Sequence, residues 1–202
     1  HSRKNHINAG GIHRTDRLTK NLQEQNSTIS PMEIAKVQFE LVVVSVLLDA
    51  GAGARWYYFD ERHQREYSRS EGLAVASFEM FMKGGFSSDL AHPLQVDAQG
   101  LMNLTKTSLE HFFQVSAKNP IDGIEGRTKL LQSLGEIIAK DKKIYPQGRL
   151  GDCLDYILQS EGVSPSGIQP LQARSVLRFV LENWGEIWPS RLKLHGQSLG
   201  DV

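Results

Sequence analysis

The sequence contains a single cysteine, Cys153, and no long hydrophobic run. One cysteine excludes an intrachain disulfide framework and a cysteine-based zinc site, and it fits a reducing compartment, so we expect a cytoplasmic protein. The longest apolar run, 41–48, is interrupted by Ser45 and stops at Asp49, well short of the ~20 residues that span a bilayer. We therefore expect a soluble protein with no membrane partner.

An excess of positive charge is also missing. The chain has 23 Lys and Arg against 23 Asp and Glu, which gives a formal net charge of zero, and its pI is near 7.2. Domains that bind nucleic acid through bulk charge have a pI above about 9, so no nucleic-acid partner is expected. Residues 1–20 carry five Lys and Arg against one Asp, and this basic end is either solvated surface or an anion contact.

The common catalytic motifs are absent. The sequence has no P-loop, no G-x-G-x-x-G after a strand, no H-E-x-x-H and no G-x-S-x-G. Its seven histidines are dispersed, and none forms an i, i+4 pair on an apolar helix, so we expect neither a metal ion nor another cofactor. Cys153 lies in a predicted helix, where a small core residue is more common than a nucleophile.

Local signals predict a mainly α-helical domain with a packed core, since 40% of the residues are hydrophobic. Ser30, Pro31 and Glu33 form a helix start with a capping box. Apolar residues then recur at helical spacing, which predicts a helix over 30–48 that is buried nearly all round. The glycine-rich stretch 49–53 ends this helix.

Aromatic runs at 56–59 and 66–68 flank a polar stretch and predict a short β-hairpin. Ser70 is expected to cap a helix over 73–82, and a loop is expected over 86–100. Further helices are predicted after capping boxes at Thr107/Glu110 and Asp122/Glu125, and over 150–159 and 171–184. The fold class is thus all-α with one hairpin, in one compact domain over 1–202 that is expected to be a section of a longer chain.

Two carboxylates stand out by their surroundings. Asp49 follows an apolar helix and opens a glycine turn, and Glu71 lies in the first turn of the next apolar helix. Each also has a purely structural explanation. Asp49 can accept hydrogen bonds from backbone N–H groups of the turn, and the position of Glu71 near a helix N-terminus is electrostatically favourable for an acid. If both line one pocket, they suit cleavage of a glycosidic or N-glycosidic bond, in which a carboxylate activates water or stabilises an oxocarbenium-like sugar.

Four further side chains are candidates for substrate binding. Arg55, Arg69 and Arg127 can bind an anionic group through their forked donors. Trp56 can stack on a planar ligand, although a core or hairpin role is more common for tryptophan.

The strings at 44–53 (VSVLLDAGAG) and 69–77 (RSEGLAVAS), with Trp56 between them, form a distinctive pattern. Shorter motifs accompany them at 1–3 (HSR), 9–11 (AGG), 113–115 (FQV), 119–120 (NP), Gly123, 125–127 (EGR), 188–189 (WP), Arg191 and 199–201 (LGD). In these strings the chain resembles the fungal and bacterial uracil-catabolism family of the URC pathway, long known only as a domain of unknown function. The resemblance covers the whole chain in order, and family members are longer at both ends.

The resemblance implies a role in uracil catabolism, with a ribosylated small molecule as substrate and other enzymes of the pathway as partners. In that pathway uracil enters in ribosylated form, a partner similar to GTP cyclohydrolase II opens its ring, and a ribosylurea-type product remains. The resulting hypothesis is an N-ribosyl hydrolase that releases urea from ribosylurea or its 5′-phosphate. Its fold is expected to be similar to that of the helical DNA glycosylases and queuosine-salvage glycosidases, an analogy that does not establish function.

In this hypothesis Asp49 and Glu71 are catalytic: Asp49 activates water or stabilises the sugar cation, and Glu71 assists it. The residues expected to hold the phosphate or the urea carbonyl, or to wall the pocket, are Arg3, Arg69, Arg127 and Trp56. One alternative is a non-catalytic partner or regulator of the ring-opening enzyme, which would account for the missing motifs. A DNA repair glycosylase fits the fold analogy but not the balanced charge.

Overall fold

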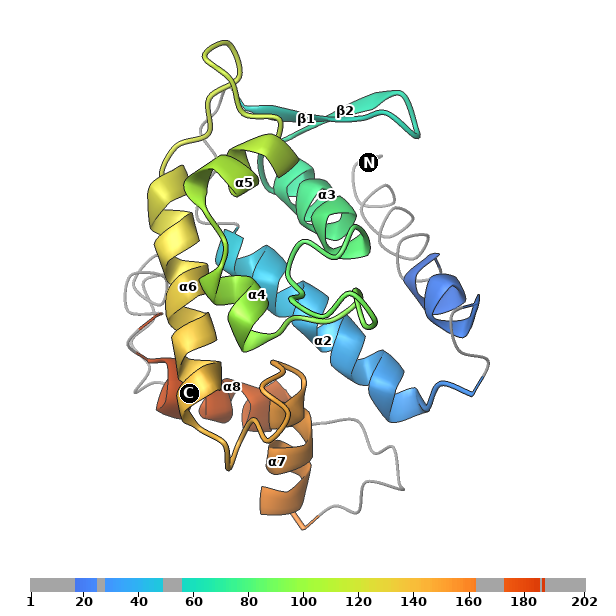
Figure 1. Ribbon diagram of the computed structural model, residues 1–202, viewed down its shortest axis with the longest axis vertical. Coiled ribbons are helices and arrows are strands. Elements are labelled where there is room, and N and C mark those ends of the chain that lie inside the picture. Colours follow the sequence, from blue (N-terminus) through green and yellow to red (C-terminus); the bar gives the residue numbers. More distant parts are fainter. Residues whose placement is uncertain (1–16, 25–27, 49–55, 163–172, 186, 188–202) are drawn as a thin grey trace, which may run out of the picture.

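The computed structural model describes residues 17–24, 28–48, 56–162, 173–185 and 187. It is mostly helical with one antiparallel hairpin, which confirms the expected fold class (Figure 1). Residues 17–24 are also helical. The named elements are α2 (Pro31–Leu48), β1 (Tyr57–Asp60), β2 (Arg65–Ser68), α3 (Arg69–Met82), α4 (Ala98–Met102), α5 (Lys106–Phe112), α6 (Ile124–Lys140), α7 (Asp152–Ser160) and α8 (Ala173–Trp184).

Helix α2 crosses the middle of the molecule and packs against α3 and α6 (Figure 1). It begins as predicted, because the Ser30 hydroxyl accepts from the backbone N–H of Glu33 at 3.1 Å. The second half of the expected capping box is replaced, since the Glu33 carboxylate pairs with Arg149 instead. The expectation that α2 is buried nearly all round was wrong: Val42 is 57% exposed and Val46 is 41% exposed.

The predicted hairpin is confirmed. Tyr57 pairs with Ser68 at its base and Asp60 with Arg65 at its tip, and Figure 1 shows it projecting beyond the helices. Helix α3 starts directly after β2, so its N-cap is Ser68 and not the predicted Ser70. The strand and the helix thus meet without a linker, at Arg69, whose φ of 56° lies in the left-handed region.

The outer edge of β1 is covered by two side-chain amides. Asn119 donates its Nδ2 to the Tyr57 carbonyl at 2.9 Å and accepts from the Tyr57 N–H at 3.0 Å. Gln114 does the same for Phe59, with Nε2 to carbonyl at 2.9 Å and N–H to Oε1 at 3.0 Å. These four bonds satisfy the backbone groups that a third strand would otherwise pair.

Two of the predicted helix starts were wrong in detail. In α5 the capping box is formed by Thr105 and Ser108, not by Thr107 and Glu110. Helix α6 has Gly123 at its N-cap, with a φ of 68°, so the Asp122 side chain does not cap it. Within the predicted 86–100 loop the structure adds the start of α4, which is too short to show a helical period and is capped by Asp97.

One hydrophobic core joins these elements. Among its largest fully buried side chains are Trp56, Phe81, Phe86, Phe113, Tyr145 and Trp184. Cys153 is also fully buried, and burial raises the pKa of its thiol, as expected for a core residue. Within the described ranges, none of the helices has the length and apolar character needed to cross a membrane.

Candidate functional site

The C-terminal end of α2 is held by Arg127 of α6. The Arg127 side chain is buried, and its Nη1 donates to the carbonyl of Leu48, the last residue of α2. Its Nε donates to the Asp122 carbonyl at 3.2 Å. The last carbonyls of a helix lack intrahelical donors and carry partial negative charge, so a guanidinium suits this place. Arg127 therefore fixes the residue that directly precedes Asp49.

Trp56 is the first described residue after the 49–55 segment, and it is fully buried. Its indole Nε1 donates to the Phe113 carbonyl at 3.0 Å, and the two rings lie 6.1 Å apart between centroids. The ring also packs against Gly72, where an added Cβ would lie 3.0 Å from it. Trp56, which directly follows the 49–55 segment in sequence, is thus held against the start of α3.

Glu71 and Arg69 are exposed in the first turn of α3, next to Gly72. An added Cβ at Gly72 would lie 2.6 Å from the Tyr67 carbonyl oxygen, so the backbone beside Glu71 is closely packed. Trp56, Arg69 and Glu71 therefore lie in one region, while Arg127 contacts Leu48, the residue that precedes the 49–55 segment. The remaining predicted site residues, Asp49 and Arg3, and the candidate Arg55, lie outside the described residues.

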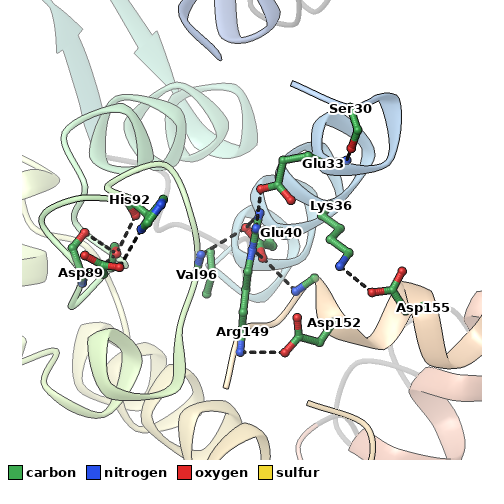
Figure 2. A network of polar contacts seen from close by, with 12 residues as sticks. Ser30, Glu33, Lys36, Glu40, Asp89, His92, Val96, Arg149, Asp152 and Asp155 are labelled. Atoms are coloured by element: carbon green, nitrogen blue, oxygen red, sulfur yellow. Dashed lines mark hydrogen bonds and ion pairs between the residues drawn. The ribbon is translucent and has the colours of Figure 1, made fainter. Parts of the chain in front are cut away.

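A buried charged cluster that sequence reasoning missed surrounds Glu40 of α2 (Figure 2). Its carboxylate accepts from Arg149 at 2.6 Å (Nε) and 3.2 Å (Nη2), from the Gly151 N–H at 2.8 Å and from the Val96 N–H at 3.2 Å. Burial raises the pKa of Glu40 to about 7, although the charge and hydrogen bonds of Arg149 act in the opposite direction. The only local signal in the sequence is a carboxylate within an apolar helix.

The cluster joins three parts of the chain. Arg149 also pairs with Glu33, about two turns before Glu40 on α2, and Lys36 pairs with Asp155 of α7 at 2.5 Å. Gly151 allows this close approach, because an added Cβ there would lie 2.7 Å from a Glu40 oxygen. Since every Glu40 oxygen is satisfied, the cluster serves as a clamp between α2, α7 and the chain before α4.

Two cavities lie beside these elements. One, of about 470 Å³, lies next to the hairpin and is lined by Tyr58, Asp60, Glu79, Arg17, His111 and Gln114, among others. The hydrogen bonds of His63 lower the pKa of Asp60 against the opposing effect of burial, and Glu79 pairs with Arg17 at 2.6 Å. The other, of about 670 Å³, lies at the start of α2.

The described residues contain no group of three or more His, Cys, Asp or Glu side chains able to hold a metal ion. Several carboxylates are held in hydrogen-bonded pairs: Asp155 pairs with Lys36, Asp60 with His63 and Glu40 with Arg149. Paired side chains of this kind can form hydrogen bonds to a small polar molecule and exchange protons with it.

The fold and the site define a helical protein with a short hairpin, a buried Glu–Arg clamp and two polar cavities. The chain belongs to the family described as "Protein of unknown function (DUF1688)", whose model matches residues 1–202. This agrees with the resemblance noted in its sequence.

Two curated relatives match the whole chain. Uracil catabolism protein 4 of Lachancea kluyveri is 36% identical over 205 residues, covering 100% of this chain and 46% of that protein. Protein urg3 of Schizosaccharomyces pombe is 38% identical over 202 residues, covering 100% of this chain and 47% of that protein. The chain therefore spans about half the length of these relatives. No solved structure matches it.

Proposed function

We propose that the protein acts in uracil catabolism, and that it hydrolyses the N-ribosyl bond of ribosylurea or of its 5′-phosphate to release urea. The pathway is suggested by the name of the Lachancea kluyveri relative, Uracil catabolism protein 4, which is 36% identical over the full chain. The single cysteine is free and buried, which supports placing the reaction in the cytoplasm.

The observation that carries the catalytic assignment is the bond from buried Arg127 to the Leu48 carbonyl. Asp49 follows Leu48 directly, and the 49–55 segment ends at Trp56, which is fixed to Phe113 and Gly72. A catalytic group needs a fixed backbone, because small displacements of a reacting group cost rate. Leu48 and Trp56, the residues on either side of segment 49–55, are such fixed points.

In the proposed reaction a water oxygen bonds to C1′ of the ribose while the bond from C1′ to the urea nitrogen breaks. Asp49 takes a proton from the water and stabilises the developing sugar cation, and Glu71 delivers a proton to the leaving nitrogen. The exposed positions of Glu71 and Arg69 leave both free to meet substrate. Arg3 and Arg69 would contact the phosphate or the urea carbonyl.

Arg127 and Trp56 receive roles that follow from their contacts. The Arg127 guanidinium already donates to two backbone carbonyls, so we assign it to positioning Asp49 and not to direct contact with substrate. The Trp56 ring is fully buried, so it supports the wall of the site from behind.

The test is urea release from synthetic ribosylurea and its 5′-phosphate by the purified protein in its natural full length. Asp49→Asn should abolish release while the circular dichroism spectrum stays unchanged. Asp141→Asn is the matched control, because Asp141 follows the last residue of α6 as Asp49 follows that of α2, and it should keep full activity. Glu71→Gln should lower kcat, whereas Glu125→Gln in the first turn of α6 should not.

A fully active Asp49→Asn protein would refute the role of Asp49. If the folded wild-type protein released no urea from either compound, the hydrolase proposal would fall. Copurification with the ring-opening enzyme would then support the alternative of a non-catalytic partner.

A further inference from the structure

The cavity of about 670 Å³ lies at the start of α2, at the opposite end of this helix from Leu48. Glu33 lines it from the first turn of α2, and fifteen residues separate Glu33 from Leu48 at the other end. At 1.5 Å per residue the two ends lie ~22 Å apart, so this cavity is separate from the proposed N-ribosyl hydrolase site. Its volume is in the range of roughly 300–1,000 Å³ that small-molecule sites occupy.

His92 stands at the rim of this cavity with its ring fixed by Asp89. The Nδ1 atom of His92 lies 2.8 Å from Asp89 Oδ2, and the other Asp89 oxygen accepts from the Ala91 N–H at 2.8 Å. Because an ionised carboxylate only accepts, Nδ1 carries the proton, and in the neutral ring Nε2 is then an acceptor. Figure 2 shows this pair on the loop that faces α2.

The loop that carries His92 is itself held in place. The Asp97 carboxylate accepts from the Ser88 N–H at 2.7 Å, from the Ser88 hydroxyl at 2.8 Å and from the Gly100 N–H at 2.7 Å. The Ser87 hydroxyl donates to the His92 carbonyl at 3.0 Å. The rim is therefore organised before any ligand binds, which lowers the entropic cost of binding.

Several hydrogen-bonding groups of the cavity wall have no partner among the described residues. One Glu33 oxygen pairs with Arg149, and within the described ranges the other has no partner. The side-chain amides of Gln95 and Gln147 line the cavity and likewise have no hydrogen bond there. Leu22, Ile29 and Leu94 provide apolar surface beside them.

The charge of the wall excludes an anion. Among the described residues that line the cavity, Arg149 is the one arginine, and its guanidinium is already bonded to Glu40 and Glu33. Glu33 and Asp89 add negative charge at the surface of the cavity. A phosphate would thus meet carboxylates and no uncommitted guanidinium, whereas hydroxyl and N–H donors would find several acceptors.

We propose that this cavity is a second small-molecule site, which takes an uncharged ligand of about nucleoside size that is rich in O–H and N–H donors. His92 Nε2 and Glu33 accept from the ligand, the amides of Gln95 and Gln147 bond its remaining groups, and Leu94 contacts its apolar face. The inference does not depend on the proposed hydrolase activity.

The experiment is a calorimetric titration of the full-length protein with uridine and with uridine 5′-monophosphate, which differ by one phosphate. Uridine should bind saturably, and the monophosphate should bind at least tenfold more weakly. His92→Phe and Gln95→Leu should each weaken uridine binding by roughly three- to tenfold, the value of one hydrogen bond. His63→Phe is the matched control, because His63 pairs with Asp60 through the same i, i+3 spacing outside this cavity.

Hydrogen exchange locates the site. Uridine should protect amides at 89–95, and Asp49→Asn should leave the affinity unchanged. Absence of saturable binding at millimolar uridine, equal binding of the monophosphate, or protection at 69–72 with no effect of His92→Phe would each overturn the proposal. Each of these outcomes is independent of whether the protein releases urea.

Discussion

The buried pair of Glu40 and Arg149 predicts a mutant whose stability defect grows with pH. Arg149→Met leaves the Glu40 carboxyl fully buried with only the backbone N–H groups of Val96 and Gly151 as donors. Removing one partner of a buried ion pair costs about 3–5 kcal/mol. The unpaired carboxyl can reduce this cost by taking up a proton, so the destabilisation is greatest at high pH.

The direction in which stability changes with pH follows from the pKa of Glu40. In the folded wild-type protein the pKa is about 7, above its ordinary value of 4.5, so the contribution of this group to the free energy of unfolding falls as pH rises from 4.5 to 7. Arg149 lowers that pKa, so Arg149→Met raises it further and the decline continues above pH 7. Above pH 7 the difference between the two proteins should grow by about 1.4 kcal/mol per pH unit.

The assay is urea denaturation at pH 5.5, 7.0 and 8.5. We expect the free energy of unfolding of Arg149→Met to differ from that of the wild type by about 2 kcal/mol more at pH 8.5 than at pH 7.0. The control is Arg17→Met, which breaks the more exposed pair with Glu79 and should cost less, with little pH dependence. A defect of Arg149→Met that is constant with pH, or smaller than that of Arg17→Met, would refute the reasoning.

Three more predictions concern single residues. Arg127→Met should lower the free energy of unfolding by about 2–4 kcal/mol in urea denaturation, because two carbonyls lose a buried donor; an unchanged midpoint would contradict this. Gly72→Ala should destabilise the fold by about 1–3 kcal/mol, because the new Cβ collides with the Tyr67 carbonyl, and thermal melting would show it. Cys153 should be inert to Ellman's reagent in the folded protein and react on unfolding, since burial raises the pKa of its thiol; rapid reaction without denaturant would disprove this.

The elements that local sequence determines were predicted well. Ser30 and Pro31 mark the start of α2 because capping depends on residues three positions apart. The aromatic runs predicted the hairpin correctly, because strand pairing across a short turn also depends on residues close in sequence. The N-cap of α6 was predicted at the wrong residue because Asp122 and Glu125 match a capping box in sequence, while the backbone uses Gly123 in a left-handed conformation.

The features that depend on distant contacts could not be predicted. Glu40 and Arg149 are 109 residues apart, and no pattern in either neighbourhood indicates their bond. Arg127 was selected as a substrate ligand, but its bond to the Leu48 carbonyl spans 79 residues and gives it a positioning role in our proposal. The exposure of Val42 was missed because a valine-rich helix has no polar face to mark its outer side.

The amides of Gln114 and Asn119 have a consequence for self-association. An exposed strand edge can template the addition of a strand from another molecule, which is a common route to aggregation. On this edge of β1 the donors and acceptors of Tyr57 and Phe59 are already used, so an incoming strand would first have to displace four hydrogen bonds. Two side chains from outside the hairpin thus protect the edge of β1 against aggregation, as a third strand paired with β1 would.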